Sequence, residues 1–267
     1  MKTKWKRCLY VYGRLLRMHL LAGLEYKGWW LMLLQVILVA LADCISPLLL
    51  FARFGAIGEW TLPRILLIYG IALTSFGLAE SFCRGFDYFP WHMLRTGAFD
   101  RLMLRPLPLT VQVAGAYFHL HRLMRVAFGA GLIAWSLATL GIAPTAAGAA
   151  VLALALLGGA AMYSGVFIMS SGIAFFTVRA LDWIYIFTNA SYQVTRIPMP
   201  YLPRALKGAF TFVVPMLVIS YYPASALCGW GDPPALGLLA LPAGLAFLGA
   251  SLLVWRLGVR HYRSAGS

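Results

Sequence analysis

Long apolar stretches separated by short polar segments run through most of the sequence, and the charged residues gather in the polar segments. A helix needs about 20 mostly apolar residues to cross the roughly 30 Å of hydrocarbon in a bilayer. The pattern therefore predicts an all-α membrane protein with six transmembrane helices. The predicted spans are Trp29–Phe51, Ile65–Phe82, Val126–Leu140, Ala146–Phe176, Ala209–Leu227 and Leu236–Trp255.

Composition excludes several other classes of protein. Of the 267 residues, 61% are apolar and 11% are charged, whereas soluble domains contain about 45–50% and about 25%. A chain this apolar does not suit a soluble enzyme, a secreted disulfide scaffold or a disordered segment. Because no repeat of 20–50 residues is visible, residues 1–267 are expected to form a single membrane domain.

The distribution of basic residues predicts the orientation of the chain. Lys and Arg outnumber Asp and Glu 22 to 8, which gives a net charge of +14. With the N-terminus in the cytoplasm, 20 of the 22 basic residues lie inside and only Arg53 and Arg64 lie outside. Cytoplasmic segments of membrane proteins are enriched in Lys and Arg, so both termini are predicted to be cytoplasmic. Orientation accounts for the basic charge, and no nucleic-acid partner is expected.

An amphipathic helix is predicted before the first span. Residues Lys4–Leu20 place apolar side chains on one side and basic side chains on the other. This pattern is typical of a helix that lies in the inner interface and contacts membrane lipids. We expect this interfacial helix over residues 4–25, either with a role in transport or only as a topology anchor.

The inner loop at residues 84–115 is longer than a hairpin requires, and it contains a stripe of apolar residues at helical spacing. Pro106 and Pro108 end the predicted short helix, because proline cannot donate the helical hydrogen bond. Such a helix either receives force from a soluble partner or only packs beneath the bundle. The stripe consists of Trp91, Leu94, Ala98 and Leu102.

The sequence contains no recognisable catalytic or metal-binding pattern. The five histidines form no HExxH motif, the four cysteines have no CxxC spacing, and neither a GxSxG elbow nor a P-loop is present. We therefore expect no enzyme activity, no metal site and no cofactor bound by this chain. Without a P-loop lysine the chain cannot hydrolyse ATP alone, so any energy for work must come from another protein.

Two acidic residues lie at membrane depth, where an ionisable side chain is costly and function is the first hypothesis. Asp43 lies inside the first predicted span and Glu80 lies near the inner end of the second. Asp43 lines a substrate route, or it pairs with Arg53 or Arg64 near the outer face, or it is a protonated or hydrogen-bonded residue that only ties helices together. Glu80 lies close enough to the membrane–water interface for its side chain to reach it.

The fourth and fifth spans carry small residues and prolines. The pairs Ala160/Ser164 and Ala161/Gly165 would let helices approach closely. Pro215 is predicted to kink the fifth span. Beyond it, residues 221–234 are rich in proline and glycine and predict an outer re-entrant element, which is either a gate or an inert plug.

Two sets of residues carry a resemblance to a known family. The first set is the run Gly97-Ala98-Phe99-Asp100-Arg101-Leu102-Met103-Leu104-Arg105-Pro106. The second is the ordered series Arg196-Ile197-Pro198, Tyr201-Leu202-Pro203, Thr211-Phe212-Val213-Val214-Pro215 and Tyr221-Tyr222-Pro223-Ala224. Together they resemble the ABC type-2 transporter permeases, and in particular a bacterial branch whose cytoplasmic motif reads roughly G-x-L-D-x-x-L-x-R-P. Phe99 stands where that branch usually has leucine, and with six spans and inner termini the resemblance covers nearly the whole chain.

The resemblance implies a six-helix half-transporter in the bacterial cytoplasmic membrane. Two permeases, identical or paralogous, would each dock on a separate ATP-binding cassette ATPase, and that ATPase would hold the ATP and Mg. The helix around residues 97–105 would be the coupling helix, with Gly97, Phe99, Asp100, Leu104, Arg105 and Pro106 as coupling residues. The candidates for the pathway or gate are Asp43, Pro215, Tyr221, Tyr222 and Pro223.

We therefore predict the permease subunit of an ATP-driven exporter for an amphiphilic, lipid-like or drug-like compound. The alternative is an ATP-independent membrane enzyme or assembly factor that acts on a hydrophobic small molecule. A secondary transporter is a third option, although such proteins usually show more intramembrane charge and inverted repeats.

Overall fold

The computed structural model describes residues 2–25, 27–56, 58–118, 120–143, 145–177, 203–208, 210–211 and 214–263. Over this part of the chain the fold is all-helical, with η1 a π-helix and η2 and η5 short 3-10 helices. The helices are α1 (Lys2–Glu25), α2 (Trp29–Phe54), α3 (Leu62–Phe89), η1 (Pro90–Leu94), α4 (Ala98–Met103), α5 (Leu109–Ala114), η2 (Leu120–Arg122), α6 (Leu123–Thr139), α7 (Ala146–Ala174), α9 (Arg204–Gly208), α10 (Met216–Cys228), η5 (Pro234–Leu239) and α11 (Ala240–His261).

Four of the described helical segments are long and apolar enough to cross a membrane: α2, α3 with η1, α7, and η5 with α11. The apolar helices α6 and α10 are shorter, with 17 and 13 residues. At about 1.5 Å per residue, α10 alone spans only about 20 Å. The fifth predicted span, Ala209–Leu227, is therefore only partly matched by α10, and residues 209, 212 and 213 of it lie outside the described residues.

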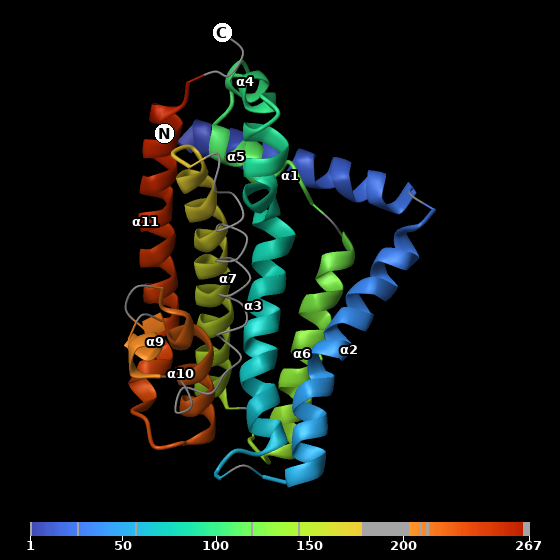
Figure 1. Cartoon of the computed structure of the whole chain (residues 1–267), viewed down its shortest axis with the longest axis vertical. Coiled ribbons are helices and arrows are strands. Elements are labelled where there is room, and N and C mark those ends of the chain that lie inside the picture. The colour runs from blue at the N-terminus through green and yellow to red at the C-terminus, as the bar shows by residue number, and fades with distance from the viewer. Residues whose placement is uncertain are drawn as a thin grey trace.

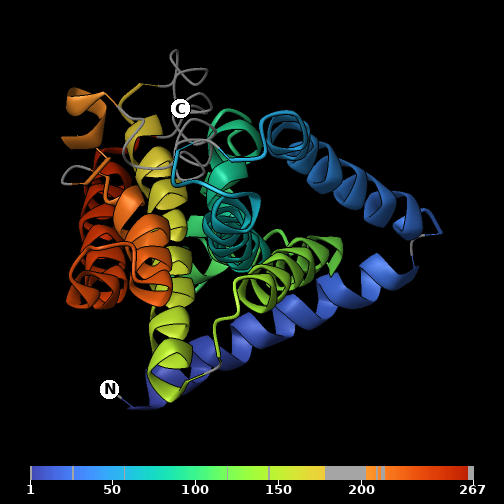
Figure 2. The same cartoon turned by 90° about the horizontal axis from the view of Figure 1, so that it is seen from below.

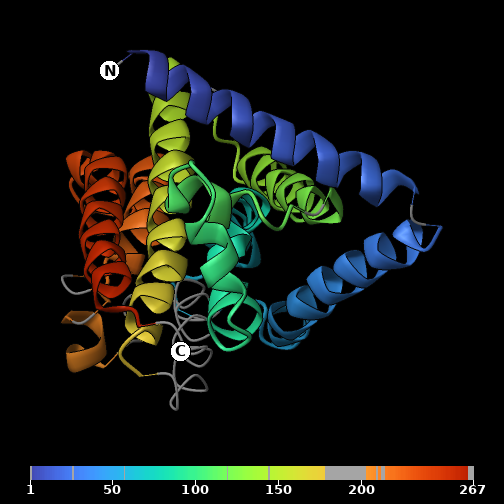
Figure 3. The same ribbon diagram turned by 90° about the horizontal axis from the view of Figure 1, so that it is seen from above.

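The long helices form a bundle in which α3, α7 and α11 stand side by side (Figure 1). The start of α1, the end of α11 and α4 lie at one end of this bundle, and the connection from α2 to α3 lies at the other end. Viewed along the bundle, α1 crosses the end that carries α4, and α2 stands apart from α7 and α11 (Figure 2 and Figure 3). This arrangement brings the basic residues of α1, of the segment between α3 and α6 and of the end of α11 to the α4 end, whereas α9 (Arg204–Gly208), with Arg204 and Lys207, lies away from α4 (Figure 1).

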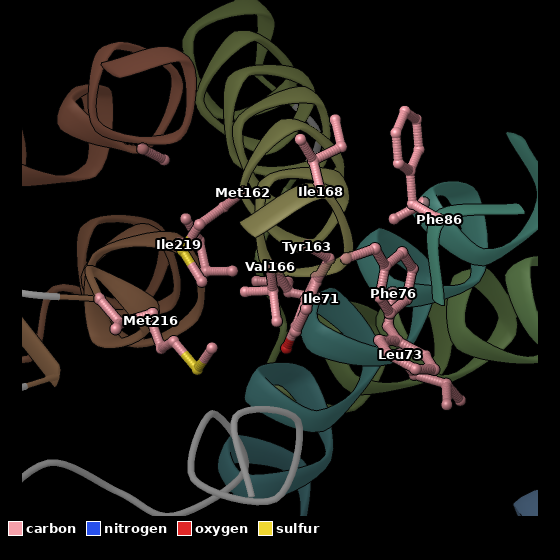
Figure 4. Packing of buried hydrophobic residues seen from close by; sticks show 14 of the residues in the cluster. Ile71, Leu73, Phe76, Phe86, Met162, Tyr163, Val166, Ile168, Met216 and Ile219 are labelled. Carbon is pink, nitrogen blue, oxygen red and sulfur yellow. The ribbon is translucent and has the colours of Figure 1, made fainter. Parts of the chain in front are cut away.

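α3 is the central helix, because it packs against α6 and α5 on one side and against α7 and α10 on the other. The ring of Phe76 meets that of Tyr163 edge-on, with the ring centroids 5.2 Å apart. The close packing of large side chains makes this the rigid interior of the molecule. The core between α3, α7 and α10 includes Ile71, Phe76, Met162, Tyr163, Val166, Met216 and Ile219 (Figure 4).

α7 and α11 meet along a seam of small residues that recur every seventh position on each helix. A Cβ atom added at Gly158 would overlap the carbonyl oxygen of Ala240, and one added at Gly244 would overlap the carbonyl oxygen of Gly158. The two backbones are therefore in direct contact, as small residues permit between membrane helices. Of the small-residue pairs predicted on the fourth span, Gly165 lies in this seam. The seam residues are Gly158, Gly165 and Gly172 on α7 and Gly244, Ser251 and Gly258 on α11.

Candidate coupling and gate sites

The predicted cytoplasmic helix over residues 91–102 is divided into two pieces in the structure, so the prediction of one continuous helix was wrong. Three residues of its apolar stripe, Trp91, Leu94 and Leu102, still pack in or against the core. The π-helix η1 ends at Leu94, and α4 begins only after Gly97, whose φ of 70° lies in the left-handed region. Glycine adopts this backbone conformation without the steric cost that a Cβ atom adds. α4 then ends at Met103, before Pro106.

Phe99 anchors α4 to the rest of the protein. Its side chain is fully buried, and its ring lies 5.1 Å from that of Phe89 and 5.0 Å from that of Tyr262, measured between centroids. We call the residues around it the inner aromatic cluster. These rings come from α3, α4, α11 and the residues that directly follow α7 and α11, so α4 is packed against the ends of three long helices. The cluster consists of Phe86, Phe89, Phe99, Phe175, Trp255 and Tyr262.

The opposite side of α4 and the turn after it are open to solvent. Leu104 is 86% exposed, which makes it the most exposed of the large apolar side chains that the structure describes. Asp100 lies half-buried in the first turn of α4, and its backbone N–H donates to the carbonyl oxygen of Gly97 at 3.2 Å. We call the exposed residues the coupling face. They are Arg101, Met103, Leu104, Arg105 and Pro106.

The sequence analysis missed Gln112, which fixes the loop behind the coupling face. Its buried side-chain amide donates to the carbonyl oxygens of Leu102, at 3.2 Å, and Leu107, at 2.9 Å. α5, which carries Gln112, is held against α3, since a Cβ atom at Gly85 would overlap the carbonyl oxygen of Val113. The signal in the sequence was an amide placed between two valines of a short apolar helix.

The interfacial helix was predicted over residues 4–25, and α1 covers Lys2–Glu25. The hydroxyl of Tyr12 donates to the carbonyl oxygen of Phe82 on α3 at 2.7 Å. Burial, followed by the nearby Cys83, raises the pKa of the Tyr12 phenol, so the hydroxyl stays protonated and remains a donor. Leu15 of the same helix face lies against Gly115, so α1 is packed onto the segment that follows α5 as well as onto α3.

Glu80 is surrounded by arginines. Its side chain is 3% exposed, and its Oε1 atom accepts from Arg84 Nη1 at 2.9 Å and also from Arg122 Nη1. Its Oε2 atom accepts from Arg125 Nη1 at 2.6 Å. Arg84 also contacts Asp87 at 3.2 Å. This ion cluster of Glu80, Arg84, Asp87, Arg122 and Arg125 links α3 to η2 and α6, and it accounts for the acidic residue at the inner end of the second predicted span.

Asp43 lies half-buried in the middle of α2, next to the buried Cys44. Of the two arginines considered as its partners, Arg64 donates to the carbonyl oxygen of Glu59 at 2.5 Å, and Arg53 lies 5.9 Å from the ring centroid of Phe54. On one helix Asp43 and Arg53 are separated by about 15 Å of rise, beyond the reach of an ion pair.

Pro215 does not kink a span, contrary to the prediction. It is the N-cap residue of α10, which begins at Met216. Proline is tolerated at a helix start because the missing N–H would have no intrahelical partner there. Pro223 is the proline inside α10, where it is buried.

The residues predicted to form an outer re-entrant element, 221–234, comprise the second half of α10 and the turn that leads to η5. Tyr221 and Tyr222 belong to α10, which ends at Gly229 with a φ of 65°. Ser225 Oγ donates to Asp232 Oδ2 at 2.7 Å and so closes the turn that leads to η5. The segment is thus a helix end, a tight turn and a 3-10 helix.

Tyr221 and Tyr222 meet two tryptophans at this end of the molecule. The ring of Trp60 lies 6.2 Å from that of Tyr221 and 5.0 Å from that of Trp230, and the two tyrosine rings lie 5.5 Å apart. This outer aromatic cluster connects α10 to the segment that precedes α3. The gate candidates Tyr221 and Tyr222 are therefore adjacent, whereas Asp43 belongs to a different helix.

An apolar cavity of about 740 Å³ lies between the ends of α6, α7 and α10, away from α4. Its walls are mostly alanine, leucine and valine. Within the described part of the chain, no three His, Cys, Asp or Glu side chains come close enough to hold a metal ion. The wall of the cavity includes Ala134, Leu137, Val151, Leu152, Ala226 and Leu227.

Comparison with known families decides the kind of protein. A family model described as ABC-2 family transporter protein matches residues 37–266, which is most of the chain. The chain belongs to the ABC-2 transporter family. This result confirms the resemblance at the level of the family, and it identifies this ABC-2 protein as a multi-pass integral membrane component of a transporter. No curated protein and no solved structure matched the chain in the same comparisons.

Proposed function

We propose that this ABC-2 family protein is the permease subunit of an ATP-driven exporter in the bacterial cytoplasmic membrane. The observation that carries the proposal is the contrast between Phe99 and Leu104, which are five residues apart. Phe99 is fully buried among rings from α3, α11 and the residues that follow α7 and α11, and Leu104 is 86% exposed. Leu104 and the neighbouring Met103, which is 43% exposed, form an exposed apolar patch of the kind that marks contact with another protein.

In this proposal the coupling face docks into a groove of a separate ATP-binding cassette ATPase, which holds the ATP and Mg. Asp100 and Arg105 supply charges for that interface, and Leu104 fills an apolar pocket. When the ATPase closes around nucleotide, α4 is displaced, and the inner aromatic cluster passes the displacement to α3, α7 and α11. The protein itself then needs no catalytic residues and no bound cofactor.

The proposed topology has six crossings, with α1, α4 and both termini in the cytoplasm. The Lys and Arg residues of α1, of the segment between α3 and α6 and of the end of α11 support this orientation, whereas those of α9 lie away from that end (Figure 1). α6 and α10 cross the membrane despite their length because chain adjoining each helix completes the span. A second permease, identical or paralogous, completes the pathway.

An amphiphilic, lipid-like or drug-like cargo suits the apolar spans and the apolar cavity near α10. Pockets for such ligands are lined mostly by apolar side chains. Tyr221, Tyr222 and Pro223 lie on the helix that borders both this cavity and the outer aromatic cluster. We assign them to the outer gate, with Asp43 as a separate candidate for the pathway.

Leu104→Ala, Asp100→Ala and Arg105→Ala test the coupling assignment. Each variant, reconstituted in liposomes with the ATPase subunit, is expected to lose about fivefold or more of the cargo-stimulated ATP hydrolysis, since a few residues carry most of an interface's binding energy. Insertion into the membrane should not change, because these side chains do not support the bundle.

Leu157→Ala is the matched control, since Leu157 is 58% exposed on α7 and far from the coupling face. Normal stimulation in all three variants would refute the coupling assignment. Purification of the protein without any Walker-motif partner, together with full activity of the isolated chain in liposomes, would favour the alternative of an ATP-independent membrane enzyme or assembly factor.

A further inference from the structure

The ion cluster contains hydrogen-bond donors that its own carboxylates do not use. Among the atoms that the structure describes, Arg84 Nε and Arg122 Nε are buried and have no hydrogen-bond partner. The terminal nitrogens of both side chains are engaged, since each Nη1 contacts Glu80 and Arg122 Nη2 donates to the hydroxyl of Tyr88 at 2.9 Å. The two guanidinium groups are therefore held in place, and each keeps one buried N–H group without an acceptor.

A buried N–H group without an acceptor loses its hydrogen bond to water without replacement and is destabilising. Two such groups in one cluster are best explained by an acceptor that binds there. A guanidinium group presents its donors as a rigid fork that matches the oxygens of a phosphate, and charge-assisted contacts of this kind are among the strongest hydrogen bonds in proteins.

The cluster is accessible and lies at the depth of lipid headgroups. The side chains of Arg84, Arg122 and Arg125 are 16%, 15% and 17% exposed. On α3 the cluster adjoins Phe82, where Tyr12 of the interfacial helix α1 binds. A basic amphipathic helix lies among headgroups, so the arginines lie at the level of the phosphates in the cytoplasmic leaflet.

We propose that Arg84 and Arg122, oriented by Glu80, bind the phosphate group of an anionic phospholipid from the cytoplasmic leaflet. Glu80 and Tyr88 hold the two guanidinium groups, the phosphate oxygens approach the partly exposed side of each group, and a small shift of each side chain then supplies its Nε–H group as a donor. The choice of leaflet rests on the proposed topology. The binding itself does not, and it is measured without ATPase, cargo or transport.

Native mass spectrometry of the full chain in detergent tests this proposal. The protein is titrated with phosphatidylglycerol, with phosphatidylcholine and with inorganic phosphate. We expect one phosphatidylglycerol to bind about tenfold more tightly than phosphatidylcholine, since charge-assisted hydrogen bonds favour a phosphate whose charge is not offset by choline. Arg84→Gln and Arg122→Gln are each expected to lower the affinity for phosphatidylglycerol by about tenfold.

Arg17→Gln is the matched control, because it removes the same charge from an exposed position on α1. An equal loss of affinity for phosphatidylglycerol in Arg17→Gln would show that the binding depends on general surface charge, and it would overturn the proposed site. Should the Arg84 and Arg122 variants fail to fold, the lipid preference of the unchanged protein decides, since equal binding of the two lipids overturns the proposal. Inorganic phosphate that binds as tightly as phosphatidylglycerol would identify a soluble anion as the ligand and overturn the lipid assignment.

Discussion

Gln112 holds the loop behind the coupling face through two hydrogen bonds to backbone carbonyl oxygens. Gln112→Leu keeps the approximate volume of the side chain but removes both donors. We expect the variant to lose about 1–3 kcal/mol of unfolding free energy, because two carbonyl groups lose their partner. Thermal unfolding in detergent measures this loss. Gln35→Leu, at an exposed position of α2, is the control, and an equal Tm for the two variants would contradict the role of Gln112.

Phe99 and Leu104 are expected to respond differently to truncation, although both belong to the proposed coupling segment. Phe99→Ala opens a cavity in the inner aromatic cluster and should cost about 3–5 kcal/mol, whereas Leu104→Ala should leave the Tm unchanged. Phe99→Leu should restore much of the stability, since leucine refills most of the space. Thermal unfolding of the three variants checks this order, and a normal Tm for Phe99→Ala would show that the cluster does not anchor α4.

The packing of whole helices can be tested at the seam between α7 and α11. Gly158→Val places a branched side chain against the backbone of α11 and should cost about 1–3 kcal/mol through overpacking. Gly131→Val on α6 is the matched control, because no atom lies within 4 Å of a Cβ placed there. Differential scanning fluorimetry compares the two variants. A smaller loss for Gly158→Val than for Gly131→Val would mean that the two helices are not in backbone contact.

The spacing and length of the apolar stretches predicted most of the apolar helices, because such helices depend on local sequence. The same signals could not predict contacts between segments that are far apart in the sequence. Arg84 is one helical turn from Glu80, but Arg122 and Arg125 are 42 and 45 residues away, and only the packing of α6 on α3 brings them there. Pro215 was misplaced for a related reason, because apolar residues precede it and hide the start of α10. Gln112 was missed because its partners are backbone atoms.

The topology of the whole molecule can be tested with single cysteines. We expect Leu104→Cys to react with a membrane-impermeant maleimide only from the cytoplasmic side, and Ala143→Cys only from the outside. The second position distinguishes six crossings from four, since Ala143 lies between α6 and α7 and would be cytoplasmic if α6 did not cross. Mass spectrometry of labelled cells and inverted vesicles measures the reaction. The unchanged protein controls for its own thiols, and cytoplasmic labelling of Ala143→Cys would refute six crossings.

The seam between α7 and α11 limits which motions this permease can make. Two helices whose backbones touch at Gly158 and Gly244, and again near Gly172 and Gly258, have no side-chain layer that could slide or repack between them. They must therefore move together as one rigid body. Relative movement is then left to the boundaries with fewer contacts, such as that of α2, which packs against α6 but stands apart from α7 and α11 (Figure 2).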